Sequence, residues 1–277
     1  MSSAMAGEGG GNPVVEISGN VNKYNFAGKR CVVTGAGKGL GLAVTEAILD
    51  AGASVLAVSR TGADLDRLQA SLTSESAGRL KTAVVDLSDC QALQQSLESY
   101  GDIDFLVNNA GVALISPLLE TSAEDFDTTM AVNVRAALVS IQVVARNLIA
   151  RKANGGAIVN VSSQASMVAL PSHTSYCASK AAMDMLTKST ALEMGPYGIR
   201  CNAVNPTVVM TAMGRANWSD PCKAGPMLRG TPLGRFAELD EVVKPILFLL
   251  SEQAGMVTGT CMPIEGGFLS CATLAPA

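Results

Sequence analysis

Residues 30–41 read Arg-Cys-Val-Val-Thr-Gly-Ala-Gly-Lys-Gly-Leu-Gly, and this stretch decides the fold. A β-rich run over 30–34 leads into alternating glycines, and a helical pattern follows as far as Asp50. Glycines let the backbone turn sharply and approach a pyrophosphate, which the amino end of the following helix attracts. A glycine motif alone is a weak signal, but a strand before it and a helix after it together predict a dinucleotide-binding unit.

The same alternation of apolar runs and helical patterns continues along the chain. Further strands are predicted over residues 54–59, 82–85, 103–107, 156–161, 199–204 and 259–264. Because these runs are continuously apolar and alternate with helices, they predict a parallel sheet that is covered on both faces. Right-handed crossovers between such strands give an α/β fold with a single doubly wound parallel sheet, of the Rossmann type.

One domain is expected, because no linker or change of composition divides the chain. Residues 1–25, rich in Gly, Ser, Ala and Asn, are predicted to be a flexible leader before a domain over 26–277. Residues 206–235 are rich in Pro, Gly and Met and lie between the sixth predicted strand and the next helix. That position is at the carboxyl edge of the sheet, where ligands bind, so this stretch is predicted to be a mobile substrate lid.

The composition excludes several classes of protein. With a net charge of −4 and 4% aromatic residues, the chain has neither the basic field nor the stacking platforms of a nucleic-acid-binding protein. We expect no transmembrane segment and no secretory signal. The seven cysteines form no Cys-x-x-Cys pair and have no His partners at metal-ligand spacing, so we expect no metal site and a reducing, cytoplasmic location.

The residues after the second predicted strand bear on the choice of cofactor. A free ribose hydroxyl favours a carboxylate at this position, whereas a 2′-phosphate favours cations. The chain has Ser59-Arg60-Thr61 with no carboxylate before Asp64, and Lys38 lies within the glycine turn. A planar guanidinium contacts a phosphate through two hydrogen bonds, so Arg60 together with Lys38 favours NADP over NAD.

A tyrosine and a lysine four residues apart, Tyr176 and Lys180, lie in the helical pattern that follows the fifth predicted strand, which ends near Ser163. This spacing places the phenol and the ammonium on one face of a helix. A free phenol has a pKa of about 10, and a neighbouring ammonium would lower it, so Tyr176 could pass a proton to a carbonyl oxygen that Ser163 orients. Asn133, in the preceding helical pattern, could hold a water that links Lys180 to solvent. Taken alone, a tyrosine four residues before a lysine is commonplace and indicates only surface packing; its conjunction with the glycine turn, Asn108-Asn-Ala-Gly111 and Ser163 makes it specific.

In order and spacing, these residues resemble the classical short-chain dehydrogenase/reductases. The resemblance covers residues 26–270 and rests on Thr34-Gly-x-x-x-Gly-x-Gly41, Asn108-Asn-Ala-Gly111, Asn133, Ser163 and Tyr176-x-x-x-Lys180. It implies catalytic roles for Asn133, Ser163, Tyr176 and Lys180. The predicted cofactor-binding set then comprises Gly35, Gly37, Lys38, Gly39, Leu40, Gly41, Ser59, Arg60, Thr61, Asp86, Leu87, Asn109, Ala110, Gly111, Tyr176, Lys180, Val209 and Thr211. Within this set, Asp86 either contacts the edge of the adenine or caps the start of the next helix.

Four further runs, at 58–61, 160–164, 205–211 and 217–221, resemble a narrower branch of that family, which reduces L-xylulose to xylitol and α-dicarbonyls such as diacetyl. The family usually has glycine after the proline at Pro206, and the branch shares the threonine found here. The resemblance implies NADPH as the reductant, a small-molecule substrate and a homotetramer.

The predicted substrate residues are Ser163, Gln164, Leu170, His173, Tyr176 and Trp218. His173 either binds a sugar hydroxyl, as the resemblance implies, or makes a structural hydrogen bond at a helix start. Trp218 either closes over a small substrate or anchors the lid to the body. Gln164, His173 and Trp218 together indicate a small polar pocket.

Two other functions remain as alternatives. A reductase of a steroid or 3-oxoacyl ketone would need a large apolar pocket. A non-catalytic NADP-binding protein would have no need of Ser163, Tyr176 and Lys180 together. The leading hypothesis is therefore an NADPH-dependent reductase of small polar ketones.

Overall fold

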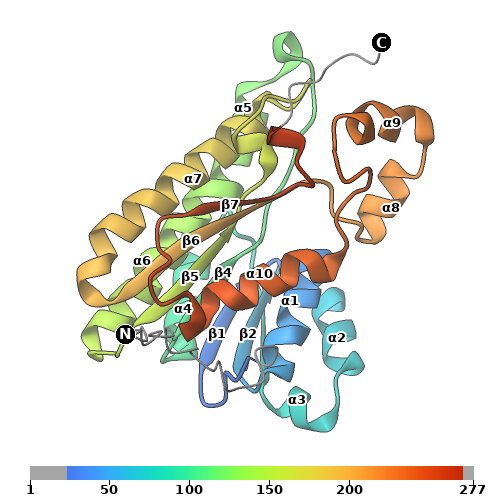
Figure 1. Cartoon of the computed structure of the whole chain (residues 1–277). Coiled ribbons are helices and arrows are strands. Elements are labelled where there is room, and N and C mark those ends of the chain that lie inside the picture. The colour runs from blue at the N-terminus through green and yellow to red at the C-terminus, as the bar shows by residue number, and fades with distance from the viewer. Residues whose placement is uncertain (1–23, 271–277) are drawn as a thin grey trace, which may run out of the picture.

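A seven-stranded parallel sheet forms the centre of the molecule, with the strand order β3-β2-β1-β4-β5-β6-β7 (Figure 1). The computed structural model describes residues 24–270, so the predicted leader lies outside the described residues except for Tyr24 and Asn25. The strands are β1 Arg30–Thr34, β2 Ser54–Ser59, β3 Leu80–Val84, β4 Phe105–Asn108, β5 Gly156–Val161, β6 Ile199–Pro206 and β7 Cys261–Ile264. The doubly wound fold is confirmed, although β3 begins earlier, β6 ends later and β7 is shorter than predicted. The order reverses between β1 and β4, which is where such sheets bind ligands.

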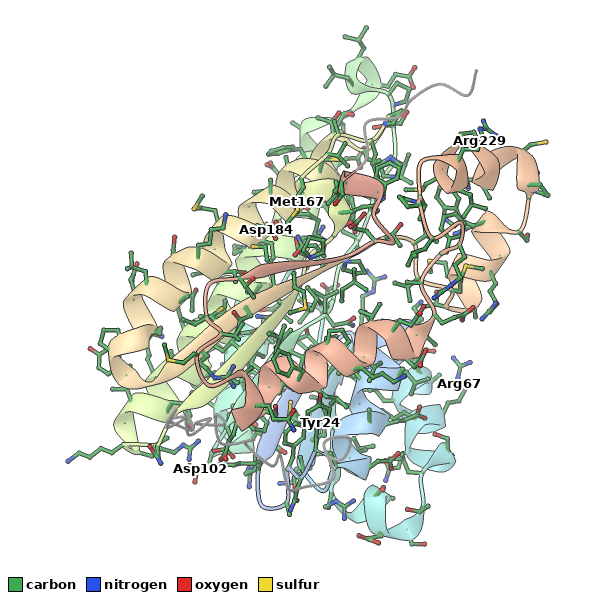
Figure 2. The ribbon with its side chains drawn as sticks, viewed as in Figure 1. Tyr24, Arg67, Asp102, Met167, Asp184 and Arg229 are labelled. Carbon is green, nitrogen blue, oxygen red and sulfur yellow. The ribbon has the colours of Figure 1, made fainter. Side chains whose placement is uncertain are left out.

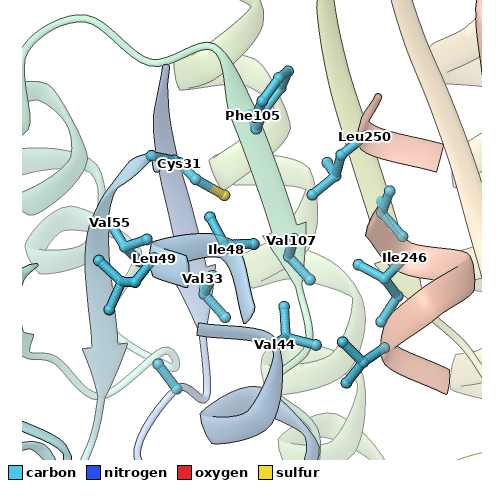
Figure 3. Packing of buried hydrophobic residues seen from close by; sticks show 14 of the residues in the cluster. Cys31, Val33, Val44, Ile48, Leu49, Val55, Phe105, Val107, Ile246 and Leu250 are labelled. Carbon is cyan, nitrogen blue, oxygen red and sulfur yellow. The ribbon is translucent and has the colours of Figure 1, made fainter. Parts of the chain in front are cut away.

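Helices cover both faces of the sheet. The helices are α1 Gly39–Asp50, α2 Gly62–Ser71, α3 Ser74–Gly78, α4 Cys90–Tyr100, α5 Ala123–Met130, α6 Ala136–Ala150, α7 Thr174–Met194, α8 Ala212–Trp218, α9 Pro221–Arg229 and α10 Leu239–Leu250. Because side chains of a strand alternate between faces, Val33 joins the cluster that includes Ile48 of α1 and Ile246 of α10 (Figure 3). Its neighbour Val32 belongs to the opposite cluster, with Leu97 of α4 and residues of α6. The sheet is therefore buried on both sides, as a parallel sheet requires.

The helix α5 continues into α6 through a π-helical turn over Ala131–Arg135, so that one helix spans Ala123–Ala150. By length and by a mean hydropathy of 1.4, this helix is apolar enough to cross a membrane, which the sequence analysis did not expect. However, 56% of its apolar window is buried within the protein, and α6 packs against α4 and β4. This burial is the pattern of a core helix that covers one face of the sheet.

The predicted lid contains two short helices. After β6 ends at Pro206, the chain forms α8 and α9, which lie to one side of the sheet (Figure 1). The indole of Trp218 packs edge-on against the buried ring of Phe236, with ring centres 5.4 Å apart. The ammonium of Lys223 lies 5.1 Å from the centre of the indole. In this structure, Trp218 therefore anchors the two helices to the body of the protein.

Candidate active site

The glycine turn after β1 has a backbone that side chains would disrupt. Gly35 has a φ of +67°, which L-amino acids with side chains rarely adopt. A Cβ atom at Gly41 would lie 2.1 Å from the carbonyl oxygen of Gly35, so the first turn of α1 can approach the glycine turn only without that atom. The amino end of α1 consequently points its free N–H groups at the edge of the sheet, where an anionic pyrophosphate is stabilised.

An open pocket of about 260 Å³ lies at this edge, at the carboxyl ends of β1, β2 and β4. Its lining includes many of the predicted cofactor residues: Gly35, Lys38, Leu40, Gly41, Ser59, Arg60, Thr61, Asp86, Leu87, Asn109, Ala110 and Gly111. The other predicted members, Gly37, Gly39, Tyr176, Lys180, Val209 and Thr211, are not part of this lining. The pocket also contains four residues that the sequence analysis missed, namely Asp64, Val85, Val112 and Val132.

Asn109 joins the ends of two strands. Its Nδ2 donates to the carbonyl oxygens of Thr34 and Gly35 at 3.0 and 3.2 Å, and its backbone N–H donates to the hydroxyl of Thr34 at 3.1 Å. These bonds tie the end of β4 to the end of β1 and to the glycine turn. The side chain of Asn109 therefore holds the walls of the pocket together.

The cations of the pocket are exposed, whereas its extra carboxylate is buried. Among residues 24–270, neither Lys38 nor Arg60 forms an ion pair. Asp64 is buried against Gly37: a Cβ atom added to that glycine would lie 2.6 Å from the Cβ of Asp64. The carboxylate of Asp64 forms an ion pair with Arg67, which lies on the next turn of α2. Arg67 therefore offsets the charge of Asp64.

Asp86 lies on the surface just after β3. Its Oδ1 accepts hydrogen bonds from the backbone N–H and the hydroxyl of Ser88, at 2.9 and 2.8 Å. These two hydrogen bonds lower the pKa of Asp86, the one from the backbone N–H more than the one from the hydroxyl. The nearby charge of Arg60 lowers it further. The cap of α4 is instead Asp89, which accepts from the N–H groups of Gln91 and Ala92.

Thr211 connects the lid to the glycine turn. Its hydroxyl caps α8 by accepting a hydrogen bond from the N–H of Gly214 at 3.0 Å. Its Cγ2 lies 3.3 Å from the position that a Cβ at Gly39 would occupy. The neighbouring Val209 forms a parallel β-bridge with Ala237, which fixes the start of the lid against the segment that ends it.

Tyr176 and Lys180 lie on one face of α7, close to the end of β5. The ammonium of Lys180 lies 5.6 Å from the centre of the Tyr176 ring and donates to the carbonyl oxygen of Val161 at 2.8 Å. Ser163 follows β5, and its hydroxyl accepts from the N–H of Ala165 at 3.1 Å. Ser163 and Lys180 are buried, with 8% and 3% of their surface exposed, so both groups are largely shielded from solvent.

Burial controls the proton affinities of this pair. It raises the pKa of Tyr176, and a hydrogen bond with Ser163 offsets only part of that rise. The net shift in this structure is thus opposite to the acidification that the spacing predicted, because burial raises the pKa of the phenol and the ammonium of Lys180 donates to Val161. Burial also lowers the pKa of Lys180 to about 8, while Asp184 acts in the opposite direction. At neutral pH the phenol consequently holds its proton, as a proton donor must.

Asn133 lies in the π-helical turn between α5 and α6, fully buried. Its Oδ1 accepts from the N–H of Val112 at 2.8 Å, and its Nδ2 donates to the carbonyl of Val112 and the hydroxyl of Ser179, each at 2.9 Å. A Cβ atom at Gly111 would lie 3.3 Å from Asn133 Oδ1 and 3.5 Å from Lys180 Nζ. Asn133 thus lies near Lys180, but its hydrogen bonds go to protein groups.

Of the predicted substrate residues, Gln164 lies next to Ser163 and His173 lies against Tyr176, whereas Trp218 packs elsewhere. Gln164 directly follows it and is 2% exposed, and neither its Oε1 nor its Nε2 has a hydrogen-bond partner among the described residues. His173 directly precedes α7, with its ring edge-on to Tyr176 at a centroid distance of 6.3 Å and its Nδ1 2.6 Å from the carbonyl oxygen of Pro171. Leu170 is half-buried in the loop between them, whereas Trp218 packs on Phe236.

Comparisons with known proteins agree with this arrangement. The family described as "Enoyl-(Acyl carrier protein) reductase" matches residues 35–269. L-xylulose reductase of Mesocricetus auratus is 58% identical over 244 residues, covering 88% of this chain and 98% of that protein. Carbonyl reductase [NADPH] 2 of Sus scrofa is 46% identical and covers 90% of this chain and 99% of its own length.

A solved structure agrees as well. A gluconate 5-dehydrogenase from Burkholderia cenocepacia J2315, in complex with NADP and tartrate, superposes with a TM-score of 0.83 at 30% identity and covers 90% of this chain and 98% of its own. With the fold, the glycine turn and the Ser163–Tyr176–Lys180 cluster, these matches lead to one conclusion. The chain belongs to the short-chain dehydrogenase/reductase family and is a nicotinamide-dependent oxidoreductase that acts on CH–OH groups of small molecules.

Proposed function

We propose that the protein is an NADPH-dependent carbonyl reductase that converts L-xylulose to xylitol and also reduces small α-dicarbonyls such as diacetyl. The observation that carries this proposal is the buried amide of Gln164 beside Ser163, which has no hydrogen-bond partner in the described protein. A buried amide without a partner is costly, and a substrate with several oxygens offsets that cost. The names of the relatives, L-xylulose reductase and carbonyl reductase [NADPH] 2, support the same class of substrate.

The pocket beside the glycine turn fits a phosphorylated dinucleotide. A Cβ at Gly41 would meet the carbonyl oxygen of Gly35, so this glycine lets α1 begin directly beside the turn, where the N–H groups of its first turn can bind a pyrophosphate. We propose that Lys38 and Arg60 hold the 2′-phosphate, since both are exposed and unpaired among residues 24–270 while Asp64 is balanced by Arg67. When bound, the reduced nicotinamide supplies a hydride to the carbonyl carbon.

The residues of α7 and the end of β5 handle the proton. Tyr176 donates its phenolic proton to the carbonyl oxygen, which becomes the new hydroxyl of the product. Ser163 donates a hydrogen bond to the same oxygen and orients it. Lys180 stabilises the phenolate that remains until a proton from solvent restores the phenol. Asn133 positions the chain around Gly111 through its bonds with Val112.

On the substrate side, we propose that Gln164 and His173 bind hydroxyl or carbonyl oxygens and that Leu170 forms an apolar wall. The Nδ1 atom of His173 is engaged by Pro171, which leaves Nε2 available to a substrate. Residues 206–235 act as the lid. Because Trp218 already packs against Phe236, closure moves α8 and α9 together rather than the indole alone.

A homotetramer in the cytoplasm completes the proposal, with residues 26–277 as the single catalytic domain. Large apolar side chains are exposed on α6 and α7, including Leu138, Met185 and Leu192, the last with 79% of its surface exposed. A groove of about 260 Å³ runs between these two helices. Such a face is typical of helix pairing between subunits.

A side-by-side assay of NADPH consumption tests the function. The full chain is given L-xylulose, diacetyl or a steroid ketone, and we expect the first two to be reduced and the steroid to react slowly or not at all. Faster reduction of the steroid would favour the alternative of a large apolar substrate. Tight NADPH binding without turnover on any of the three would favour a non-catalytic NADP-binding protein.

A further inference from the structure

A buried carboxylate lies one helical turn beyond Lys180. Asp184 is only 8% exposed and lies on the side of α7 that faces the sheet (Figure 2). The spacing of four residues places it on the same helix face as Lys180. Among the described residues, it is the carboxylate whose charge favours the protonated form of that lysine.

An amide from the neighbouring strand holds this carboxylate. Asn205, fully buried near the end of β6, places its Nδ2 3.1 and 2.9 Å from the two carboxylate oxygens of Asp184. The same nitrogen lies 2.9 Å from the hydroxyl of Ser166 and 3.2 Å from the carbonyl oxygen of Ser163. The opposite amide orientation would point an oxygen at a carboxylate, so the contacts themselves determine which way the amide lies.

One side chain therefore connects three parts of the site: α7, which carries Tyr176 and Lys180, the turn that follows Ser163, and the end of β6, where the lid begins. The carbonyl oxygen of Lys180 also accepts a bond from the hydroxyl of Ser162 at 3.2 Å. These bonds fix the distance between Ser163 and the helix that bears the other two groups.

The surroundings of Asp184 supply few other charges. The remaining charged or titratable groups near Asp184 and Lys180, among the described residues, are Tyr176, Cys177 and Lys188 on α7 and Cys261 on β7. The adjacent parts of β5, β6 and the turn after Ser163 contribute the neutral groups already named. A buried ammonium without a counter-charge loses its proton, so Asp184 offsets a cost that burial imposes on Lys180.

We propose that Asp184, held by Asn205, is a positioning residue that keeps Lys180 charged and fixes the turn carrying Ser163 relative to α7. This inference rests on the proposed role of Lys180 in carbonyl reduction. It assigns a function to two buried side chains, one on α7 and one on β6, that do not touch the reacting atoms.

The test replaces Asp184 by its neutral isostere and follows activity against pH. In Asp184→Asn, the pH above which kcat/KM falls is expected to move down by about one unit, because the compensating charge is gone. The matched control is Asp240→Asn, which removes an aspartate four residues from a lysine on the exposed surface of α10, where Asp240 and Lys244 form an ion pair. That control is expected to keep the wild-type profile. A folded Asp184→Asn protein with the wild-type profile would overturn the proposal.

A second comparison decides the matter if Asp184→Asn does not fold. The double variant Lys180→Met with Asp184→Asn carries no buried ammonium, so it is expected to recover a folded protein with a measurable melting temperature. If the double variant is also unfolded, Asp184 has only a structural role and the proposal fails. A wild-type protein without reductase activity would instead contradict the proposed function, and the comparison of melting temperatures would still test the interaction of the two residues.

Discussion

The charged side chains on the two sides of the site differ in their exposure to solvent. On the cofactor side, formed by β1, β2 and the glycine turn, Lys38 and Arg60 are exposed beside an open pocket. On the catalytic side, formed by β5, β6 and α7, Lys180 and Asp184 are buried with 3% and 8% of their surface exposed. Exposed cations attract a phosphate that arrives from water, and salt screens them. On the catalytic side, burial lowers the pKa of Lys180, and perturbed proton affinities of this kind are typical of sites that transfer protons.

The largest effect is expected on the catalytic side, from Tyr176→Phe. Removing the phenolic hydroxyl removes the proton donor, so kcat should fall by about 10²–10⁴-fold. Because the cofactor side is untouched, fluorescence titration should give an unchanged affinity for NADPH. The exposed tyrosine at 197 provides the control Tyr197→Phe, which should retain full activity. Full turnover in Tyr176→Phe would contradict the assignment.

A smaller effect, confined to the cofactor side, is expected from Gly41→Ala. The added Cβ would lie 2.1 Å from the carbonyl oxygen of Gly35, so the turn must shift. Displacing the N–H groups that hold the pyrophosphate is expected to cost about 3 kcal/mol of binding free energy, which weakens NADPH binding by about 100-fold. Gly62→Ala is the control, since the nearest atom there is 3.5 Å away. Equal affinities for the two variants would mean that the glycine turn does not contact the cofactor.

Arg60→Asp sharpens the comparison by reversing a charge on the exposed side. Loss of a charge-assisted contact should lower the preference for NADPH over NADH by about 10-fold to 100-fold, and less at high salt. Steady-state kinetics with both cofactors measures the ratio. Lys29→Asp, which changes an exposed cation before β1, should leave the ratio unchanged. An unaltered ratio in Arg60→Asp would show that this guanidinium does not recognise the phosphate.

The smallest effect is a pH dependence of the wild-type protein. The pKa of Lys180 is lowered to about 8 by burial, so this side chain loses its charge as the pH rises through that value. Reduction should therefore slow above about pH 8, by several-fold over the next pH unit, because the protonated fraction of Lys180 falls about tenfold for each pH unit well above its pKa. Measuring kcat/KM from pH 6 to 10 provides the check. A profile that stays level beyond pH 9 would mean that the charge of Lys180 is not needed.

Local features of this fold could be predicted from the sequence. The strand, glycines and helix over 30–50 are adjacent in the chain, and the spacing of Tyr176 and Lys180 on a helix determines their common face. The parallel sheet also followed from apolar runs alternating with helices. In each case the deciding information lies within one or two neighbouring elements.

Features that depend on tertiary packing could not be predicted in this way. Asp64 enters the pocket because α2 packs beside the glycine turn, and Asp184 meets Asn205 because α7 lies across β6. The direction of the net pKa shift of Tyr176 also depends on packing, since spacing reveals the neighbouring lysine but not how deeply both side chains are buried. A helical pattern likewise does not reveal that Trp218 would pack against Phe236.

The most direct test of the account follows a labelled hydride into product. Purified protein is incubated at pH 7 with L-xylulose and NADPH that carries deuterium at both positions of nicotinamide C4, and the product is analysed by mass spectrometry. The account predicts xylitol with one deuterium on the former ketone carbon from the wild type and almost no xylitol from Tyr176→Phe. Unlabelled xylitol, or an equal yield from Tyr176→Phe, would contradict it.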